Sequence, residues 1–128
     1  IARLLFNMMW AFRLGLRAAS PVICKDARFP EMMDSDLTKT AVESLLTSIA
    51  SLRRTELRPK LEEIKVPVMG MYGDRDNIVD PRQWQPLNRG VPQAHIVRWR
   101  MAQHFVMLDM PQDFMEKLKA FLDEEVPN

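Results

Sequence analysis

An acidic residue and a histidine each follow an apolar run of the chain, in an order that suits acid–base chemistry. The first run, 66–72, leads into a polar corner that ends in Asp76, and the second run, 94–99, leads into a segment that contains His104. Residues just past the ends of neighbouring parallel strands meet at one edge of a sheet. A carboxylate placed there can orient an imidazole and stabilise its protonated form, as the general base of an acyl transfer requires.

The elements expected to position these residues follow from apolar periodicity and from proline and glycine. Helices are expected over 1–18, ended by Ser20-Pro21, and over 37–54, with Asp36 as its N-cap. The second of these helices should pack through an apolar stripe made of Val42, Leu45, Leu46, Ile49 and Leu52. Residues 21–36 are expected to be loop and 55–65 a connecting turn or short helix. The strands should span 66–72 and 94–99. A helix, kinked or broken at Pro86, should run from Pro81 to about Asn88 with Gly90 as its C-cap. A last helix should span about 111–125, with a buried face of Phe114, Leu118, Phe121 and Leu122.

Two stretches of the sequence carry family motifs. Residues 66–79, VPVMGMYGDRDNIV, resemble the acid-bearing segment of the α/β-hydrolase superfamily, and residues 103–114, QHFVMLDMPQDF, resemble its histidine segment. The resemblance implies an α/β fold in which this chain is the C-terminal portion, with parallel strands and flanking helices preceded by helical cap elements. It places a helical cap or lid at residues 1–55 and the hydrolase core at 56–128.

The resemblance also implies roles for individual residues. His104 is the expected general base and Asp76 the expected acid that orients it. Asp74 is the rival acid, but a turn residue that accepts backbone hydrogen bonds is the simpler interpretation for it. Asp80 is expected to cap the helix that follows. His95 is expected to be structural or surface-exposed.

The nucleophile of the superfamily sits in a Gly-x-Ser-x-Gly-type elbow earlier in the chain. None of the four glycines flanks a serine in that arrangement. The resemblance therefore implies that the nucleophile, expected to be a serine, comes from an upstream hydrolase segment or from a partner chain. The expected function is cofactor-free hydrolysis of a small carboxylic ester or related acyl substrate. Epoxide, lactone, halide, C–C and peptide bonds are also cleaved in this superfamily, and the two motifs do not separate these reactions.

The composition of the chain limits which class of protein, which partners and which cofactors are expected. With 47% apolar and 27% charged residues, the chain is globular in class, and its formal net charge of +1 gives no reason to expect nucleic acid or an anionic membrane as a partner. Arg3 and Arg13 interrupt the apolar N-terminal stretch, so no membrane span is expected. Two histidines and the single Cys24 lack metal-site spacing, so neither a metal nor a cofactor is expected. Cys24 cannot form an internal disulfide, which favours a reducing, cytoplasmic setting.

A second hypothesis belongs to a different class of function. The chain is then a truncated, non-catalytic hydrolase that acts as a protein-interaction module through an exposed strand edge and methionine-rich helices. The absence of the serine elbow from these 128 residues favours this hypothesis. The presence of both Asp76 and His104 disfavours it, because binding alone requires neither residue.

Overall fold

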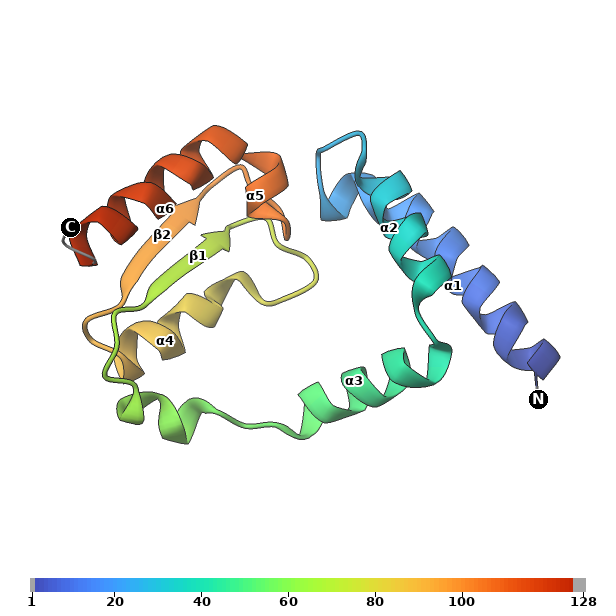
Figure 1. Cartoon of the computed structure of the whole chain (residues 1–128), viewed down its shortest axis with the longest axis horizontal. Helices are drawn as coiled ribbons and strands as arrows, with labels where there is room; N and C mark the ends of the chain where they lie inside the picture. Colours follow the sequence, from blue (N-terminus) through green and yellow to red (C-terminus); the bar gives the residue numbers. More distant parts are fainter. Residues whose placement is uncertain (1, 126–128) are drawn as a thin grey trace. The chain divides into compact units, whose positions relative to one another are not determined.

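The computed structural model describes residues 2–125, so Ile1 of the predicted first helix lies outside the described residues (Figure 1). The chain divides into two compact units. One contains the residues up to Pro21 and Asp26–Glu56, and the other contains Val22–Lys25 and the residues from Leu57 onward. We call Val22–Lys25 the linker segment. The role of residues 1–55 as a cap stays a prediction.

The first unit is built mainly from helices. They are α1 (Ala2–Ile23), α2 (Phe29–Lys39) and α3 (Val42–Arg54). Arg13 of α1 and Asp34 of α2 form a two-point ion pair, with Nε–Oδ1 and Nη2–Oδ2 distances of 2.8 and 2.7 Å. Phe29 and Leu37 of α2 are buried.

The predicted end of the first helix at Ser20-Pro21 is wrong, because α1 continues to Ile23. Proline has no N–H, so the carbonyl of Arg17 loses the hydrogen bond that residue 21 normally donates in a helix. The buried Ser20 hydroxyl donates to that carbonyl at 2.8 Å instead. This replacement bond lets the helix accommodate Pro21.

The predicted loop over 21–36 and the predicted single helix over 37–54 are both corrected. Pro30 lies in the first turn of α2, where a missing N–H costs no helical bond. Asp36 is inside α2 rather than an N-cap, and the break falls at Thr40, whose N–H and hydroxyl bond to the carbonyls of Leu37 and Asp36. The helix α3 then starts after the extended Ala41.

The apolar stripe predicted on the 37–54 helix is largely exposed. Leu46, Ile49 and Leu52 of α3 are 49%, 44% and 75% exposed. Met32 of α2 is also exposed. Among the side chains of the first unit that the structure describes, the buried apolar ones are Phe29 and Leu37 of α2.

The second unit contains a sheet of two parallel strands, β1 (Met69–Gly73) and β2 (His95–Trp99), in the register Met69↔His95 to Gly73↔Trp99. The predicted parallel pair is confirmed, although β1 begins three residues later than predicted. In Figure 1 the sheet lies between α4 (Trp84–Gly90) and α6 (Pro111–Glu125).

Alternate side chains of the strands meet these two helices. A Cβ added to Gly70 would lie 2.8 Å from Leu87 of α4, so the absence of a side chain makes room for that leucine. On the other face, the His95 ring meets Phe121 of α6 edge-on, with 5.4 Å between centroids. The sheet is thus covered on both faces, as short apolar parallel strands require.

The crossover between the strands begins with the short 3-10 helix η2 (Pro81–Gln83), which continues into α4. The change from 3-10 to α helix falls at Trp84, so the predicted break at Pro86 is wrong in position. Pro86 is tolerated because it falls in the first turn of α4. The predicted C-cap at Gly90 is wrong. Gly90 is helical, and a Cβ there would lie 2.5 Å from the Cβ of Leu61 in the 3-10 helix η1 (Arg58–Glu63).

After β2 the chain forms a loop, the four-residue helix α5 (Val106–Asp109) and α6. The predicted last helix over 111–125 is confirmed, although Leu122, predicted to be buried, is 48% exposed. The most buried apolar side chains of this unit are Ile23, Cys24, Val91, Ala102 and Val106. Several of them surround the loop after β2, so the core of this unit lies beside the predicted site. Within residues 2–125 no helix is both long and apolar enough to cross a bilayer.

Candidate active site

Asp76 lies in the tight turn that follows β1. Its own N–H donates to the carbonyl of Gly73 at 3.2 Å, which closes the turn. Its Oδ1 accepts hydrogen bonds from the N–H groups of Ile78 and Val79, at 2.8 and 2.9 Å. An aspartate bonded in this way to the next residues of a turn is held in one orientation. Backbone hydrogen bonds alone are therefore sufficient to orient the carboxylate.

His104 lies in the loop that follows β2 and meets the remaining oxygen of that carboxylate. The distance from His104 Nδ1 to Asp76 Oδ2 is 2.9 Å. The side chains of His104 and Asp76 are 30% and 14% exposed. The ring of Phe105 packs edge-on against the imidazole, with 4.8 Å between centroids. The two residues predicted from sequence are thus adjacent, just past the carboxyl ends of two parallel strands.

The charge of Asp76 determines how the histidine is protonated. Partial burial opposes ionisation, but the Val79 N–H, the His104 ring and the Ile78 N–H donate to the carboxylate and lower the pKa of Asp76. An ionised carboxylate can only accept hydrogen bonds, so the proton of a neutral His104 resides on Nδ1. The lone pair of Nε2 is then available to take a proton, as in a general base.

Gly73, the last residue of β1, allows the histidine loop to approach the acid turn. A Cβ at this position would lie 2.2 Å from the carbonyl oxygen of Gln103 and 2.6 Å from that of Ala102. Backbone bonds join the same two segments, since the N–H of Arg75 donates to the Ala102 carbonyl at 3.0 Å. The distance between Asp76 and His104 therefore depends on the missing side chain of Gly73.

Replacing Gly73 by alanine is expected to push the histidine loop away from the acid turn. Overpacking of this kind costs about 1–3 kcal/mol of stability. A displacement of about 1 Å at the reacting groups costs about 10²-fold in rate. Chemical denaturation measures the first effect, and the rate of the ester hydrolysis predicted from the sequence would measure the second.

The matched control for this prediction is Gly15→Ala, because a Cβ at Gly15 meets nothing within 4 Å. Gly15 is inside α1, where alanine is expected to raise stability by up to about 1 kcal/mol. Equal stability and activity in Gly73→Ala and the wild type would contradict the importance of the close approach.

The other predicted residues take structural positions. Asp74, the rival acid, pairs with Arg98 of β2, with 2.9 Å between Oδ1 and Nε, rather than with His104. Arg98 also stacks over the ring of Trp84 at 4.8 Å. Asp80 caps η2 by accepting from the Arg82 N–H, as predicted, and His95 is exposed.

Asp109 is a residue of this site that the sequence analysis missed. Its carboxylate accepts hydrogen bonds from the backbone N–H of Gln103 and from that of Lys25. The sequence offers only a weak signal for such a residue, because every amino acid other than proline carries the N–H that it binds. An acid at the end of the short helix α5, two residues before Pro111, is the one local hint.

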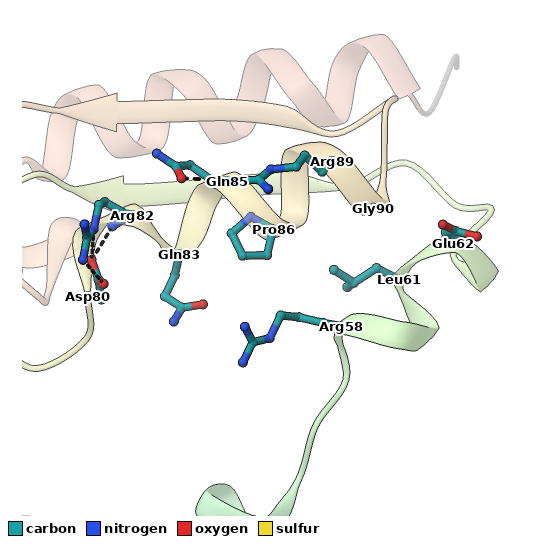
Figure 2. Close-up of a pocket in the computed structure, with 10 residues that line it drawn as sticks. All are labelled: Arg58, Leu61, Glu62, Asp80, Arg82, Gln83, Gln85, Pro86, Arg89 and Gly90. Carbon is teal, nitrogen blue, oxygen red and sulfur yellow. Dashed lines mark hydrogen bonds and ion pairs between the residues drawn. The ribbon is translucent and has the colours of Figure 1, made fainter.

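A cavity of about 550 Å³ lies between η1 and the η2–α4 segment (Figure 2). Arg58, Arg82 and Arg89 contribute to its lining, and Figure 2 shows Arg82 paired with Asp80 and Arg89 beside Gln85. The Arg82–Asp80 ion pair is 2.9 Å long. The cavity shares no lining residue with the Asp76–His104 pair. Among the described residues, no group of three His, Cys, Asp or Glu side chains is arranged to hold a metal ion.

The sequence was also compared with those of known proteins and with protein-family models. No protein-family model matches the chain. The chain is similar to curated proteins named pimeloyl-[acyl-carrier protein] methyl ester esterase. The one from Yersinia pseudotuberculosis serotype O:1b (strain IP 31758) is 29% identical over 100 residues, which cover 78% of this chain and 39% of the relative.

Two further relatives carry the same name. The protein from Photorhabdus laumondii subsp. laumondii is 28% identical over 102 residues, covering 80% of this chain and 39% of the relative. The protein from Vibrio cholerae serotype O1 is 27% identical over 79 residues, covering 62% and 31%. The matched segment thus spans less than half the length of these relatives, all of which are named as esterases.

Proposed function

We propose that this chain is the acid- and histidine-bearing part of an α/β-hydrolase that hydrolyses a carboxylic ester. The observation that carries the proposal is the 2.9 Å contact between His104 Nδ1 and Asp76 Oδ2, made just past the ends of two parallel strands. The similarity to proteins named as esterases supports the same reaction class. A role limited to stability accounts for the two backbone hydrogen bonds of Asp76, but it does not require a histidine at the remaining carboxylate oxygen.

In the proposed mechanism, Asp76 holds His104 with Nε2 unprotonated. His104 removes the proton of a nucleophilic hydroxyl as that oxygen attacks the ester carbonyl, and the imidazolium then protonates the departing alkoxide. Water, activated by the same histidine, cleaves the acyl-enzyme and regenerates the hydroxyl. Asp76 stays ionised throughout and stabilises the imidazolium. General acid–base chemistry of this kind needs no cofactor.

The proposed nucleophile is a serine of an upstream hydrolase segment or of a partner chain. The relatives are more than twice as long as the segment that matches, and no Gly-x-Ser-x-Gly pattern occurs in these 128 residues. The proposed substrate class is a methyl ester of an acyl group attached to a carrier protein, because the relatives are named for that substrate. Residues 1–55 are proposed to form a lid over the acyl chain, with Met32 and Met33 as adaptable apolar contacts.

The proposal is tested on a protein that contains both this chain and the proposed upstream segment. We expect release of methanol from a methyl-esterified acyl carrier protein, and covalent labelling of one serine by a fluorophosphonate, which reacts with activated serine hydroxyls. Mass spectrometry of the labelled peptide identifies the nucleophile. Absence of both methanol release and labelling would rule out the esterase.

The alternative is a non-catalytic interaction module, and the exposed apolar stripe of α3 is the observation that favours it. Exposed apolar surface of this kind marks contact sites for other chains. Against it stands the contact between His104 and Asp76, which a binding role does not require. A failed labelling experiment together with a stable complex in size-exclusion chromatography would favour this alternative.

A further inference from the structure

The carboxylate of Asp109 joins two segments that lie beside His104. Asp109 is the last residue of α5. Its Oδ2 accepts a hydrogen bond of 2.6 Å from the N–H of Gln103, the residue just before His104. Its Oδ1 accepts one of 2.7 Å from the N–H of Lys25, in the linker segment. One side chain therefore connects the histidine loop to a part of the chain almost eighty residues away.

The linker segment also holds His104 directly. The N–H of His104 donates to the carbonyl of Ile23 at 3.2 Å. Ile23 and Cys24 are only 4% and 2% exposed, so this contact lies in the core of the second unit. The thiol of Cys24 lies 3.4 Å from Asp109 Oδ1. The histidine backbone is thus bound to the linker segment both directly and through Asp109.

We propose that Asp109 is a positioning residue for His104. A carboxylate is suited to this task because its two oxygens accept from the two backbone donors at once, and charge-assisted hydrogen bonds are stronger than neutral ones. An asparagine at this position has only one acceptor oxygen, so one of the two segments is released. The catalytic consequence rests on the proposed function, because it requires that His104 acts as the base.

Asp109→Asn in the full protein tests the proposal. We expect kcat for methyl ester hydrolysis to fall by about 10- to 100-fold, because a small misplacement of a catalytic group costs up to about 10²-fold. KM is expected to change by less than about twofold, since the substrate does not contact Asp109 in this proposal. Asp113→Asn is the matched control, because Asp113 is an exposed acid in the first turn of α6. The control is expected to retain wild-type kcat.

A spectroscopic measurement separates positioning from general stability. In the wild type, the Nδ1 proton of His104 should give a downfield NMR signal, assigned by its loss in His104→Ala. We expect Asp109→Asn to weaken that signal through faster exchange with water and to speed hydrogen exchange at the amides of Gln103 and Lys25. Asp113→Asn is expected to leave all three unchanged.

The proposal is overturned if folded Asp109→Asn keeps both wild-type kcat and the downfield signal. It is also overturned if the wild-type amides of Gln103 and Lys25 exchange as fast as those of exposed loops, a result that does not require the variant to fold. A protein that hydrolyses no ester would defeat the proposed function, while the NMR signal and the amide exchange would still decide the role of Asp109.

Discussion

Replacing His104 by alanine is expected to lower kcat for ester hydrolysis by about 10³-fold or more, with KM within about twofold of the wild type. The imidazole is the proposed base for both acylation and deacylation, and its loss leaves Asp76 with no group to orient. Steady-state kinetics on a methyl ester, measured in the protein that includes the nucleophile, give both constants. Fluorophosphonate labelling of the serine should slow to a similar extent, because activation of the hydroxyl depends on the same base.

His95→Ala is the matched control for this variant. His95 is the other histidine of the chain, is exposed on β2 and packs edge-on against Phe121. Activity within about twofold of the wild type is expected for it, since small surface changes away from the site have little effect. Equal losses in the two variants would show that the effect comes from the fold and not from the proposed base.

Asp76→Asn is expected to lower kcat by about 10³- to 10⁴-fold. An asparagine keeps the shape of the side chain but removes the negative charge that stabilises the imidazolium. It also allows an amide group to face His104, which favours the proton on the wrong ring nitrogen. Because the pKa of Asp76 is lowered, the wild-type carboxylate is ionised at neutral pH. The loss of kcat in Asp76→Asn should therefore be seen throughout the neutral pH range.

The same chemical change two residues earlier provides the control. Asp74→Asn removes an acid from the same turn, but the partner of this acid is Arg98, at 2.8 Å in the ion pair. A partly exposed ion pair of this kind contributes at most about 1 kcal/mol, so less than about tenfold loss of activity is expected. A large loss in Asp74→Asn with full activity in Asp76→Asn would reverse the assignment of the orienting acid.

The two variants also separate the esterase from the interaction module. If the protein is an interaction module, neither His104→Ala nor Asp76→Asn should change partner binding, apart from an effect on stability. An esterase predicts losses of several orders of magnitude at unchanged folding. Circular dichroism and denaturation of each variant therefore accompany the kinetics.

The local sequence was sufficient to predict the two parallel strands, the last helix and the cap at Asp80. Each depends on a short-range pattern: an apolar run bounded by turn residues, or a proline and an acid at a helix start. The acid and the histidine were also predicted to lie together, because the carboxyl ends of neighbouring parallel strands lie at the same edge of a sheet. Their catalytic roles stay predictions.

Only the tertiary structure decided how the elements end and what holds the histidine. The helix α1 continues through Pro21 because a buried serine hydroxyl supplies the missing bond, and the sequence alone does not show that Ser20 is buried. The predicted packing face of α3 is exposed for a related reason, since periodicity identifies an apolar stripe but not the surface that covers it.

Gly73 and Asp109 show most clearly what could not be predicted from the sequence. Gly73 matters because the backbone at Gln103, thirty residues later, lies against it, and Asp109 matters because two distant backbone N–H groups bind its carboxylate. Almost every residue carries the same backbone N–H and C=O groups. The amino-acid type of a residue therefore does not reveal that its backbone makes such a contact. The sequence by itself determined which side chains can do acid–base chemistry, and the folded chain decided which contacts hold them at 2.9 Å.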